Sequence, residues 1–95
     1  MAPDSNAQAV DIVVRGMVQG VGFRYRCKWK ADELGLTGWA KNEVDGTVSI
    51  HLQGMNYQVE SFGNWLRGDI PGVYISRMDI SQGKISDSLE EFEIR

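Results

Sequence analysis

The fold of this chain depends on the stretch Gly16-Met17-Val18-Gln19-Gly20-Val21-Gly22-Phe23-Arg24, because it joins a strand-like segment to a helix-like segment through glycines. Glycine lets the backbone turn sharply and approach a ligand closely, and successive N–H groups in such a turn form a concavity that binds anions. A helix that begins near Phe23 would point its free N–H groups into the same space, and Arg24 would add a planar charged fork suited to phosphate oxygens. The stretch is a candidate anion cradle, formed by Gln19, Gly20, Val21, Gly22, Phe23 and Arg24.

Glycine spacing alone does not establish a ligand site, since a strand-to-helix turn is often only a tight connection. The stretch is also neither of the two common nucleotide-binding loops. It lacks the third glycine of a dinucleotide fingerprint, and no Lys-Ser or Lys-Thr pair follows the last glycine as a Walker loop requires.

The segments on either side of the cradle have opposite periodicities. Alternating apolar residues predict a strand over 8–18, with Val10, Ile12 and Val14 on one face. Apolar residues then recur every three or four positions, which predicts a helix that ends at Gly35. The buried face of that helix is expected to contain Phe23, Cys27, Ala31 and Leu34.

Downstream, the pattern predicts strands over 37–41 and 47–53, joined by a turn over 42–46 that uses Asp45-Gly46. His51 falls on the polar face of the second of these strands, where a lone histidine is expected to face solvent.

The last third of the chain predicts a helix, a strand and a short edge strand. The helix is expected over 58–67 and ends at Gly68. Apolar residues over 73–81 change phase near Ser76-Arg77, which indicates a β-bulge. A final edge strand is expected over 92–95.

This order of elements, βαββαβ, predicts an α+β ferredoxin-like fold with an antiparallel sheet, two helices on one face and the short C-terminal edge strand. Right-handed crossovers give the strand order 4-1-3-2, which would bring Arg24 and Asn42 to the same end of the sheet. We expect one domain over 8–95 after a flexible tail over 1–7.

Composition narrows the class of protein. The chain has one histidine and one cysteine, so neither a multi-histidine zinc site nor an internal disulfide is expected. No apolar run is long enough to span a membrane and no signal-peptide pattern opens the chain, which favours a reducing cytoplasm. Cys27 lies on the apolar helix face and is expected to be part of the core.

The charge is unevenly distributed. Residues 15–41 contain six basic and two acidic side chains, whereas the whole chain has a net charge of -3. The net charge argues against a general nucleic-acid binder, and the strand over 47–53 lacks the base-stacking aromatic residues of an RNA-binding domain of the same topology. The positive region would attract an anionic substrate, although a solvated helix face explains several of these basic residues equally well.

Motifs in three segments give a more specific interpretation. The chain resembles the acylphosphatase signature, in order and spacing, at Val18-Gln19-Gly20-Val21-Gly22-Phe23-Arg24, then at Leu34-Gly35-Leu36-Thr37-Gly38-Trp39, and then at Asn42 with Asp45-Gly46. The resemblance extends from about Val10 to the segment 92–95.

The resemblance implies a hydrolase that splits the carboxyl-phosphate anhydride of a small-molecule acyl phosphate, without metal or other cofactor. It puts Arg24 on the phosphate-binding arginine and Asn42 on the asparagine that orients the attacking water, so both would be catalytic. Inorganic phosphate is expected as product and competitive inhibitor, and the protein is expected to be a monomer with no nucleic-acid or membrane partner. A different class remains open, a non-catalytic anion-binding or regulatory module, because ferredoxin-like domains serve many functions.

Overall fold

The computed structural model describes residues 7–95 and contains two helices and a five-stranded sheet. The elements in chain order are β1 (Ala7–Met17), α1 (Phe23–Leu34), β2 (Thr37–Asn42), β3 (Val48–Met55), α2 (Asn56–Arg67), β4 (Tyr74–Gln82) and β5 (Phe92–Ile94). Most of the expected tail lies outside the described residues, and Ala7, which was expected to belong to it, is the first residue of β1. Asn42, expected in the turn, is the last residue of β2.

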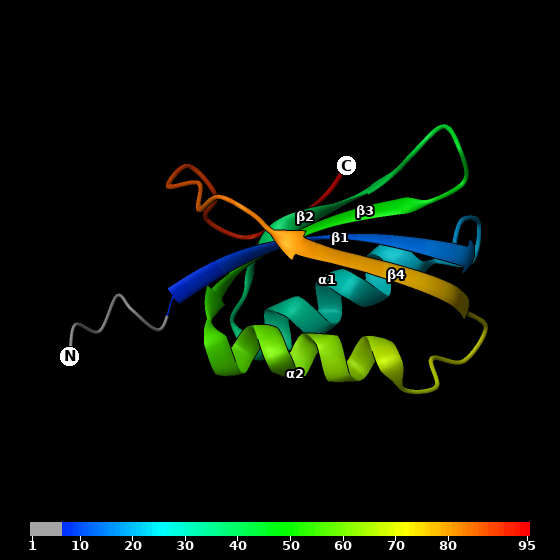
Figure 1. Cartoon of the computed structure of the whole chain (residues 1–95), viewed down its shortest axis with the longest axis horizontal. Helices are drawn as coiled ribbons and strands as arrows, with labels where there is room; N and C mark the ends of the chain where they lie inside the picture. The colour runs from blue at the N-terminus through cyan, green and yellow to red at the C-terminus, as the bar shows by residue number, and fades with distance from the viewer. Residues whose placement is uncertain (1–6) are drawn as a thin grey trace.

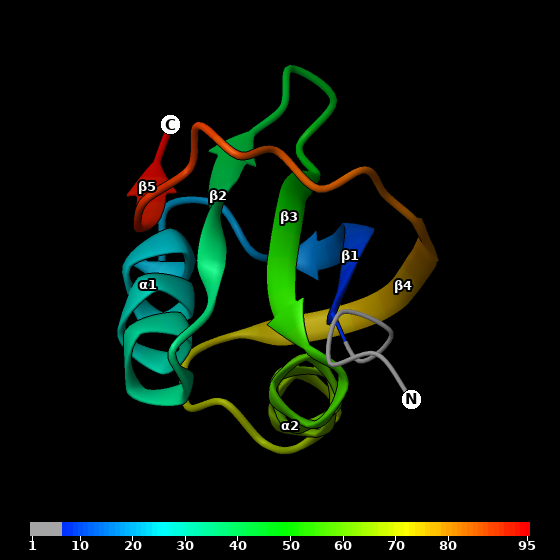
Figure 2. The same cartoon turned by 90° about the vertical axis from the view of Figure 1, so that its left-hand side faces the viewer.

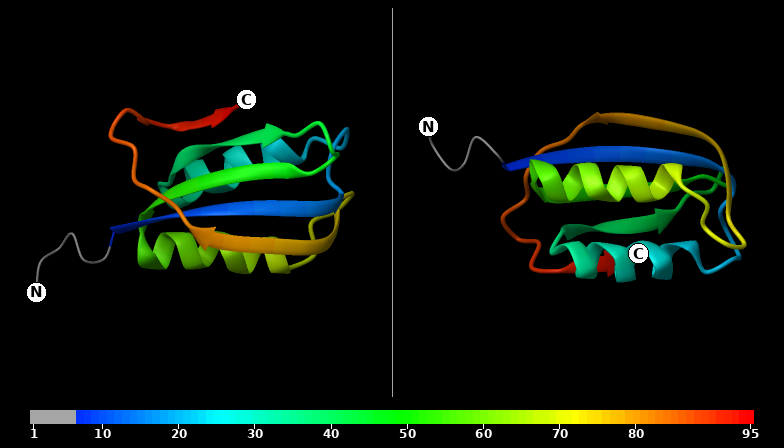
Figure 3. Two further views of the ribbon diagram at one scale, coloured as in Figure 1. Left: turned by 45° about the horizontal axis from the view of Figure 1, so that its top comes forward. Right: turned by 90° about the horizontal axis from the view of Figure 1, so that it is seen from below.

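The strands lie in the order β4-β1-β3-β2-β5, so the four long strands have the predicted order. β1 pairs antiparallel with both β3 and β4, and β2 pairs antiparallel with β3. β5 pairs in parallel with β2, which makes the sheet mixed. Both helices cover the same face (Figures 1 and 2), as the ferredoxin-like fold requires. Figure 3 shows the two helices beside one another under the sheet.

The periodicity of each helix explains which side packs on the sheet. α1 buries Phe23, Cys27 and Ala31, and it ends where Gly35 adopts a φ of 78° and donates its N–H to the main chain of the last turn. α2 buries Val59, Phe62 and Leu66. Burial of each large apolar side chain contributes about 1.5–3 kcal/mol, so these faces fix both helices against the sheet.

The bulge that the sequence predicted in the fourth strand is present. Arg15 pairs with Arg77 and Gly16 pairs with Ile75, so Ser76 is an extra residue on β4. Gly16 has a φ of 136°, and a Cβ there would collide with the main-chain oxygen of Tyr74. A glycine is therefore required where β1 passes the bulge, immediately before the cradle.

The prediction that His51 faces solvent is wrong. The side chain is on the sheet face away from the helices, yet only 6% of the residue is exposed. Its Nδ1 lies 2.7 Å from Asp11 Oδ1, its Nε2 lies 3.0 Å from Gln53 Oε1, and its ring stacks on Trp39. The segment 83–91 crosses this end of the sheet between β4 and β5 (Figure 2), and Ser86 bonds Gln53 through both main-chain groups. The strand pattern could not reveal this cover because it comes from a distant, irregular segment.

Candidate functional site

The turn between β1 and α1 has the backbone geometry of an open cradle. Gly20 and Gly22 adopt φ values of 76° and 74°, in the left-handed region that favours glycine. Gly22 is also the residue that precedes α1, and no side chain caps that helix end. The N–H groups of the first helical turn are therefore left for an acceptor from outside the helix.

A small cavity joins this turn to the end of β2. Its volume is about 130 Å³, and its lining is Val18, Gly20, Gly22, Phe23, Arg24, Tyr25 and Asn42. Arg24 and Asn42, eighteen positions apart in sequence, thus lie at one cavity. This is the juxtaposition that the predicted strand order required, since the end of β1 and the end of β2 lie at the same end of the sheet.

Asn42 is unusual among the side chains of this site. Within residues 7–95, its Oδ1 is the buried side-chain oxygen that has no hydrogen-bond partner. A buried amide oxygen is nearly always paired, and leaving it unpaired costs about 1–3 kcal/mol. Asn42 lines the cavity and its amide oxygen is unpaired, although asparagine at this position also precedes a turn.

Arg24 extends from the first turn of α1 toward β5. The residue is half-buried, and its Nη1 donates a hydrogen bond of 2.6 Å to the main-chain oxygen of Arg95. A guanidinium has five N–H groups in a rigid fork. The contact with Arg95 uses one of these donors, so other donors remain available for an anion at the cavity.

Gln19 contributes more than the main-chain N–H group that the sequence suggested. Its side-chain Nε2 donates to the main-chain oxygens of Glu43 and Thr47, at 2.8 and 2.9 Å. These acceptors belong to the turn that follows Asn42. Sequence reasoning missed this role because the contact joins positions 24 and 28 residues apart and leaves no periodic pattern.

The turn that receives Gln19 is itself internally bonded. Asp45 Oδ1 accepts hydrogen bonds from the hydroxyl and the N–H of Thr47, at 2.7 and 3.0 Å. These bonds, the hydroxyl first, lower the pKa of the Asp45 carboxyl, and the charge of Arg15 acts in the same direction. Glu43 donates its N–H to Thr47 O, which closes the turn.

The other reactive side chains lie away from this cavity. Cys27 is fully buried on α1, as the sequence predicted, and burial raises the pKa of its thiol.

In the part of the chain that the structure describes, no cluster of three or more His, Cys, Asp or Glu side chains is arranged to share a metal ion. None of the helices within residues 7–95 is long and apolar enough to cross a membrane.

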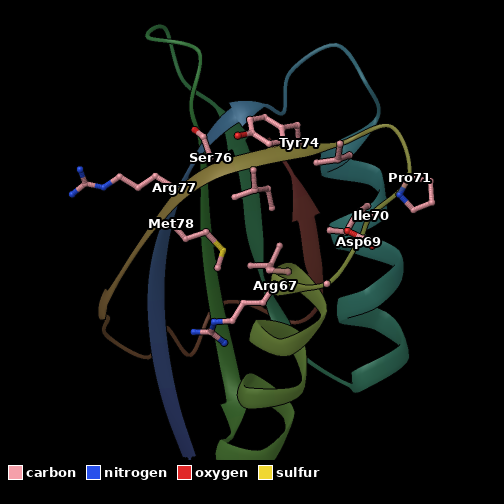
Figure 4. Close-up of a pocket in the computed structure, with 12 residues that line it drawn as sticks. Arg67, Asp69, Ile70, Pro71, Tyr74, Ser76, Arg77 and Met78 are labelled. Atoms are coloured by element: carbon pink, nitrogen blue, oxygen red, sulfur yellow. The ribbon is translucent and has the colours of Figure 1, made fainter.

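A larger cavity of about 480 Å³ lies between the end of α2, the segment 68–73 and β4 (Figure 4). Its floor includes the buried Leu66 and Ile70, and its rim includes the exposed Arg67 and Tyr74. It contains none of the predicted site residues. Size alone therefore does not identify the site, because Arg24 and Asn42 line the smaller cavity beside the open helix end.

Comparison with known proteins agrees with the motifs. The family model for acylphosphatases matches residues 10–94. An acylphosphatase of Cupriavidus pinatubonensis is 36% identical over 84 residues, which cover 88% of this chain and 91% of that protein. An acylphosphatase of a Nocardioides species is 39% identical over 87 residues, with coverage of 92% and 87%. The solved structure of an acylphosphatase from Coxiella burnetii has a TM-score of 0.90 at 31% identity and covers 100% of both chains.

The chain belongs to the acylphosphatase family. The expected activity, hydrolysis of the carboxyl-phosphate anhydride of an acyl phosphate to a carboxylate and inorganic phosphate, follows from this membership. The alternative of a non-catalytic anion-binding module is not favoured.

Proposed function

We propose that Arg24 and the main-chain N–H groups of residues 19–23 hold the phosphoryl group of the substrate, and that Asn42 orients the attacking water. The observation that carries this proposal is that Asn42, whose Oδ1 has no hydrogen-bond partner within the described residues, lines the same small cavity as Arg24. An amide oxygen there can accept a hydrogen bond from water, while the amide N–H can donate to its oxygen or to the substrate.

The chemistry of the anhydride explains why so few groups suffice. The carboxylate of an acyl phosphate leaves readily, so catalysis requires mainly that reactants are positioned and that phosphoryl charge is neutralised. The water oxygen forms a bond to phosphorus, and the bond from phosphorus to the carboxylate oxygen breaks with its electron pair. The water proton passes to a phosphoryl oxygen of the substrate. This acceptor fits the lining of the cavity, whose described side chains include no histidine, aspartate or glutamate.

The size of the cavity bears on which part of the substrate it holds, and the composition bears on where the enzyme acts. A volume of about 130 Å³ suits a phosphoryl group better than a whole substrate, which leaves the acyl group outside the cavity. Inorganic phosphate would occupy the cradle as product and as competitive inhibitor. We infer a cytoplasmic monomer without a nucleic-acid or membrane partner, in line with a lone buried cysteine and a negative net charge.

The test of this function is Asn42→Ala. Because Arg24 and the turn hold the phosphate, we expect inhibition by inorganic phosphate to change by no more than about a few-fold while kcat falls about 100- to 1,000-fold. Asn42→Asp is expected to do no better, because its carboxylate would repel the bound phosphoryl group. Steady-state kinetics with a simple aryl acyl phosphate, phosphate inhibition and thermal melting are measured on the same preparations.

Asn64→Ala is the matched control, since Asn64 is an exposed amide on α2 away from the cavity. It should keep the parent kcat. An Asn42→Ala variant that melts several degrees lower but turns over at the parent rate would make Asn42 a structural residue of the turn, and its role with water would be abandoned.

Chelation tests whether the cradle acts without metal. The proposed charge neutralisation comes from one guanidinium and from main-chain N–H groups, so prolonged treatment with EDTA should leave kcat and KM unchanged. Loss of turnover that magnesium or zinc restores would show that this division of roles is wrong.

A further inference from the structure

We propose that the side chain of Gln19 is a positioning residue: it fixes the phosphate-binding turn against the turn that follows Asn42, and so sets the direction from the water to the phosphoryl group. This inference rests on the roles proposed for Arg24 and Asn42. It assigns to Gln19 a function that its main-chain N–H group does not perform.

The contacts of Gln19 use its amide fully as a donor. An amide NH₂ group has two hydrogens, and Gln19 Nε2 has two main-chain oxygens, of Glu43 and Thr47, at 2.8 and 2.9 Å. Both acceptors flank the turn, one at each end, so the side chain holds the turn at two points. A single bond would allow the amide to rotate about it, whereas two fix its orientation.

These two bonds connect the halves of the site. One half is the glycine turn that leads to Arg24, and the other begins with Asn42, whose next residue is the acceptor Glu43. Within residues 7–95, the side-chain hydrogen bonds between residues 18–22 and 42–47 are these two alone. A second link runs from Arg24 to Arg95 O and from Arg95 N–H to Ala40 O of β2, and Gln19 is the direct side-chain link between the two turns.

The rest of each half is held independently. Asn42 pairs with Val48 in the ladder of β2 and β3, and the turn is closed by Asp45 and Thr47. The helix α1 that carries Arg24 is fixed by its own buried face. Loss of the Gln19 side chain should therefore leave both halves folded while the alignment between them relaxes.

Alignment matters because the water must approach phosphorus opposite the leaving oxygen. A misplacement of about 1 Å at a reacting group can cost about 100-fold in rate. Phosphate affinity is less sensitive, because Arg24 and the N–H groups of the glycine turn move together with the bound anion. A positioning role predicts a fall in kcat with little change in phosphate binding, and a role in stability alone does not.

The experiment compares Gln19→Leu and Gln19→Glu with the parent protein. Leucine removes the amide at similar length, and glutamate puts a carboxylate opposite two carbonyl oxygens. We expect kcat to fall about 10- to 100-fold in both, with inhibition by inorganic phosphate in Gln19→Leu within about a few-fold of the parent. Gln58→Leu is the matched control: it removes a hydrogen bond of 2.7 Å from the N–H of Met55, at the opposite end of the sheet. It should lower the melting temperature without changing kcat.

The decisive measurement repeats Gln19→Leu in the Asn42→Ala background. If Gln19 acts by aligning the water on Asn42, its effect on kcat should shrink to about twofold or less once Asn42 is absent. An equal loss in both backgrounds would assign Gln19 to the stability of the turn, and a parent kcat in Gln19→Leu would also overturn the proposal. The role proposed for Asn42 is tested separately, by the kcat of the single variant Asn42→Ala.

Discussion

Two groups of polar side chains lie on the sheet of this protein, and they differ in how completely they are paired. On the outer face, both ring nitrogens of His51 have oxygen partners, and the amide of Gln53 is bonded to both main-chain groups of Ser86. At the glycine turn, Asn42 Oδ1 is buried and has no partner within the described residues. The strands supply both groups, yet only one is left with a free acceptor.

The difference separates a structural network from a site. Burial of polar groups stabilises a fold only when they are paired, so a completed network such as that of His51 holds the segment 83–91 on the sheet. An unpaired acceptor costs the folded state free energy, and in the role proposed for Asn42 a ligand completes it. The lone histidine, which elsewhere is a frequent catalytic base, belongs to the completed network here.

Substitution of Arg24 should reduce turnover more than any other substitution proposed for this site. Arg24→Ala should lower kcat/KM by about 1,000-fold or more and weaken inhibition by phosphate, because in the proposed role the charged fork contacts both the substrate and the developing charge. Arg24→Lys should restore little, since a point charge cannot form two parallel hydrogen bonds. Steady-state kinetics and phosphate inhibition measure both.

Arg67→Ala is the control, because it removes an equal charge from the exposed end of α2. It should retain the parent kinetics. Full activity in Arg24→Lys would show that charge alone, and not the geometry of the fork, matters at this position.

His51→Ala should have the opposite profile. Loss of the bonds to Asp11 and Gln53 should lower the free energy of unfolding by about 1–3 kcal/mol, measured by urea denaturation. The value of kcat should stay within about twofold of the parent, because neither His51 nor its bonding partners line the cavity.

One path could connect the two groups. Trp39 stacks on His51, Arg95 lies over Trp39 with its guanidinium 5.0 Å from the ring centre, and Arg95 O accepts from Arg24. A tenfold fall of kcat in His51→Ala, measured on folded protein, would therefore mean that the His51 network orients Arg24 and that the network and the cavity are not independent.

Asp45 should contribute a small, pH-dependent part of the stability of the folded protein in the acid range. The hydrogen bonds from Thr47 lower the pKa of Asp45, so the folded protein binds this proton more weakly than the unfolded chain does. The resulting stability is present above the pKa of Asp45 in the unfolded chain and is lost as the pH falls through its pKa in the folded protein. The melting temperature of the parent relative to Asp45→Asn should therefore decrease toward acid pH. A constant difference between the two proteins would contradict this.

Much of the fold was predictable because its signals are local. The spacing of Phe23, Cys27 and Ala31 fixed the buried face of α1, Gly35 ended it, and a change of phase located the bulge that the structure assigns to Ser76. The resemblance to acylphosphatases added Arg24 and Asn42, and the strand order explains why both line one cavity.

The remainder depended on contacts between distant segments. The burial of His51 requires the segment 83–91, and the two hydrogen bonds of the Gln19 side chain require the turn after β2. The parallel pairing of β5 with β2 likewise joins strands that are far apart in the chain. Periodicity describes one segment at a time, so it contains no information about which irregular segment covers a strand.

The bulge at Ser76 has a consequence for solubility. β4 is an edge strand of nine residues, and a regular edge of that length is a template on which another chain can pair and aggregate. The bulge interrupts its repeat, and Arg77 and Asp79, both exposed and paired at 3.0 Å, put charge beside the interruption. The other edge, β5, is only three residues long. Both edges are thus poor templates for the addition of a strand from another chain.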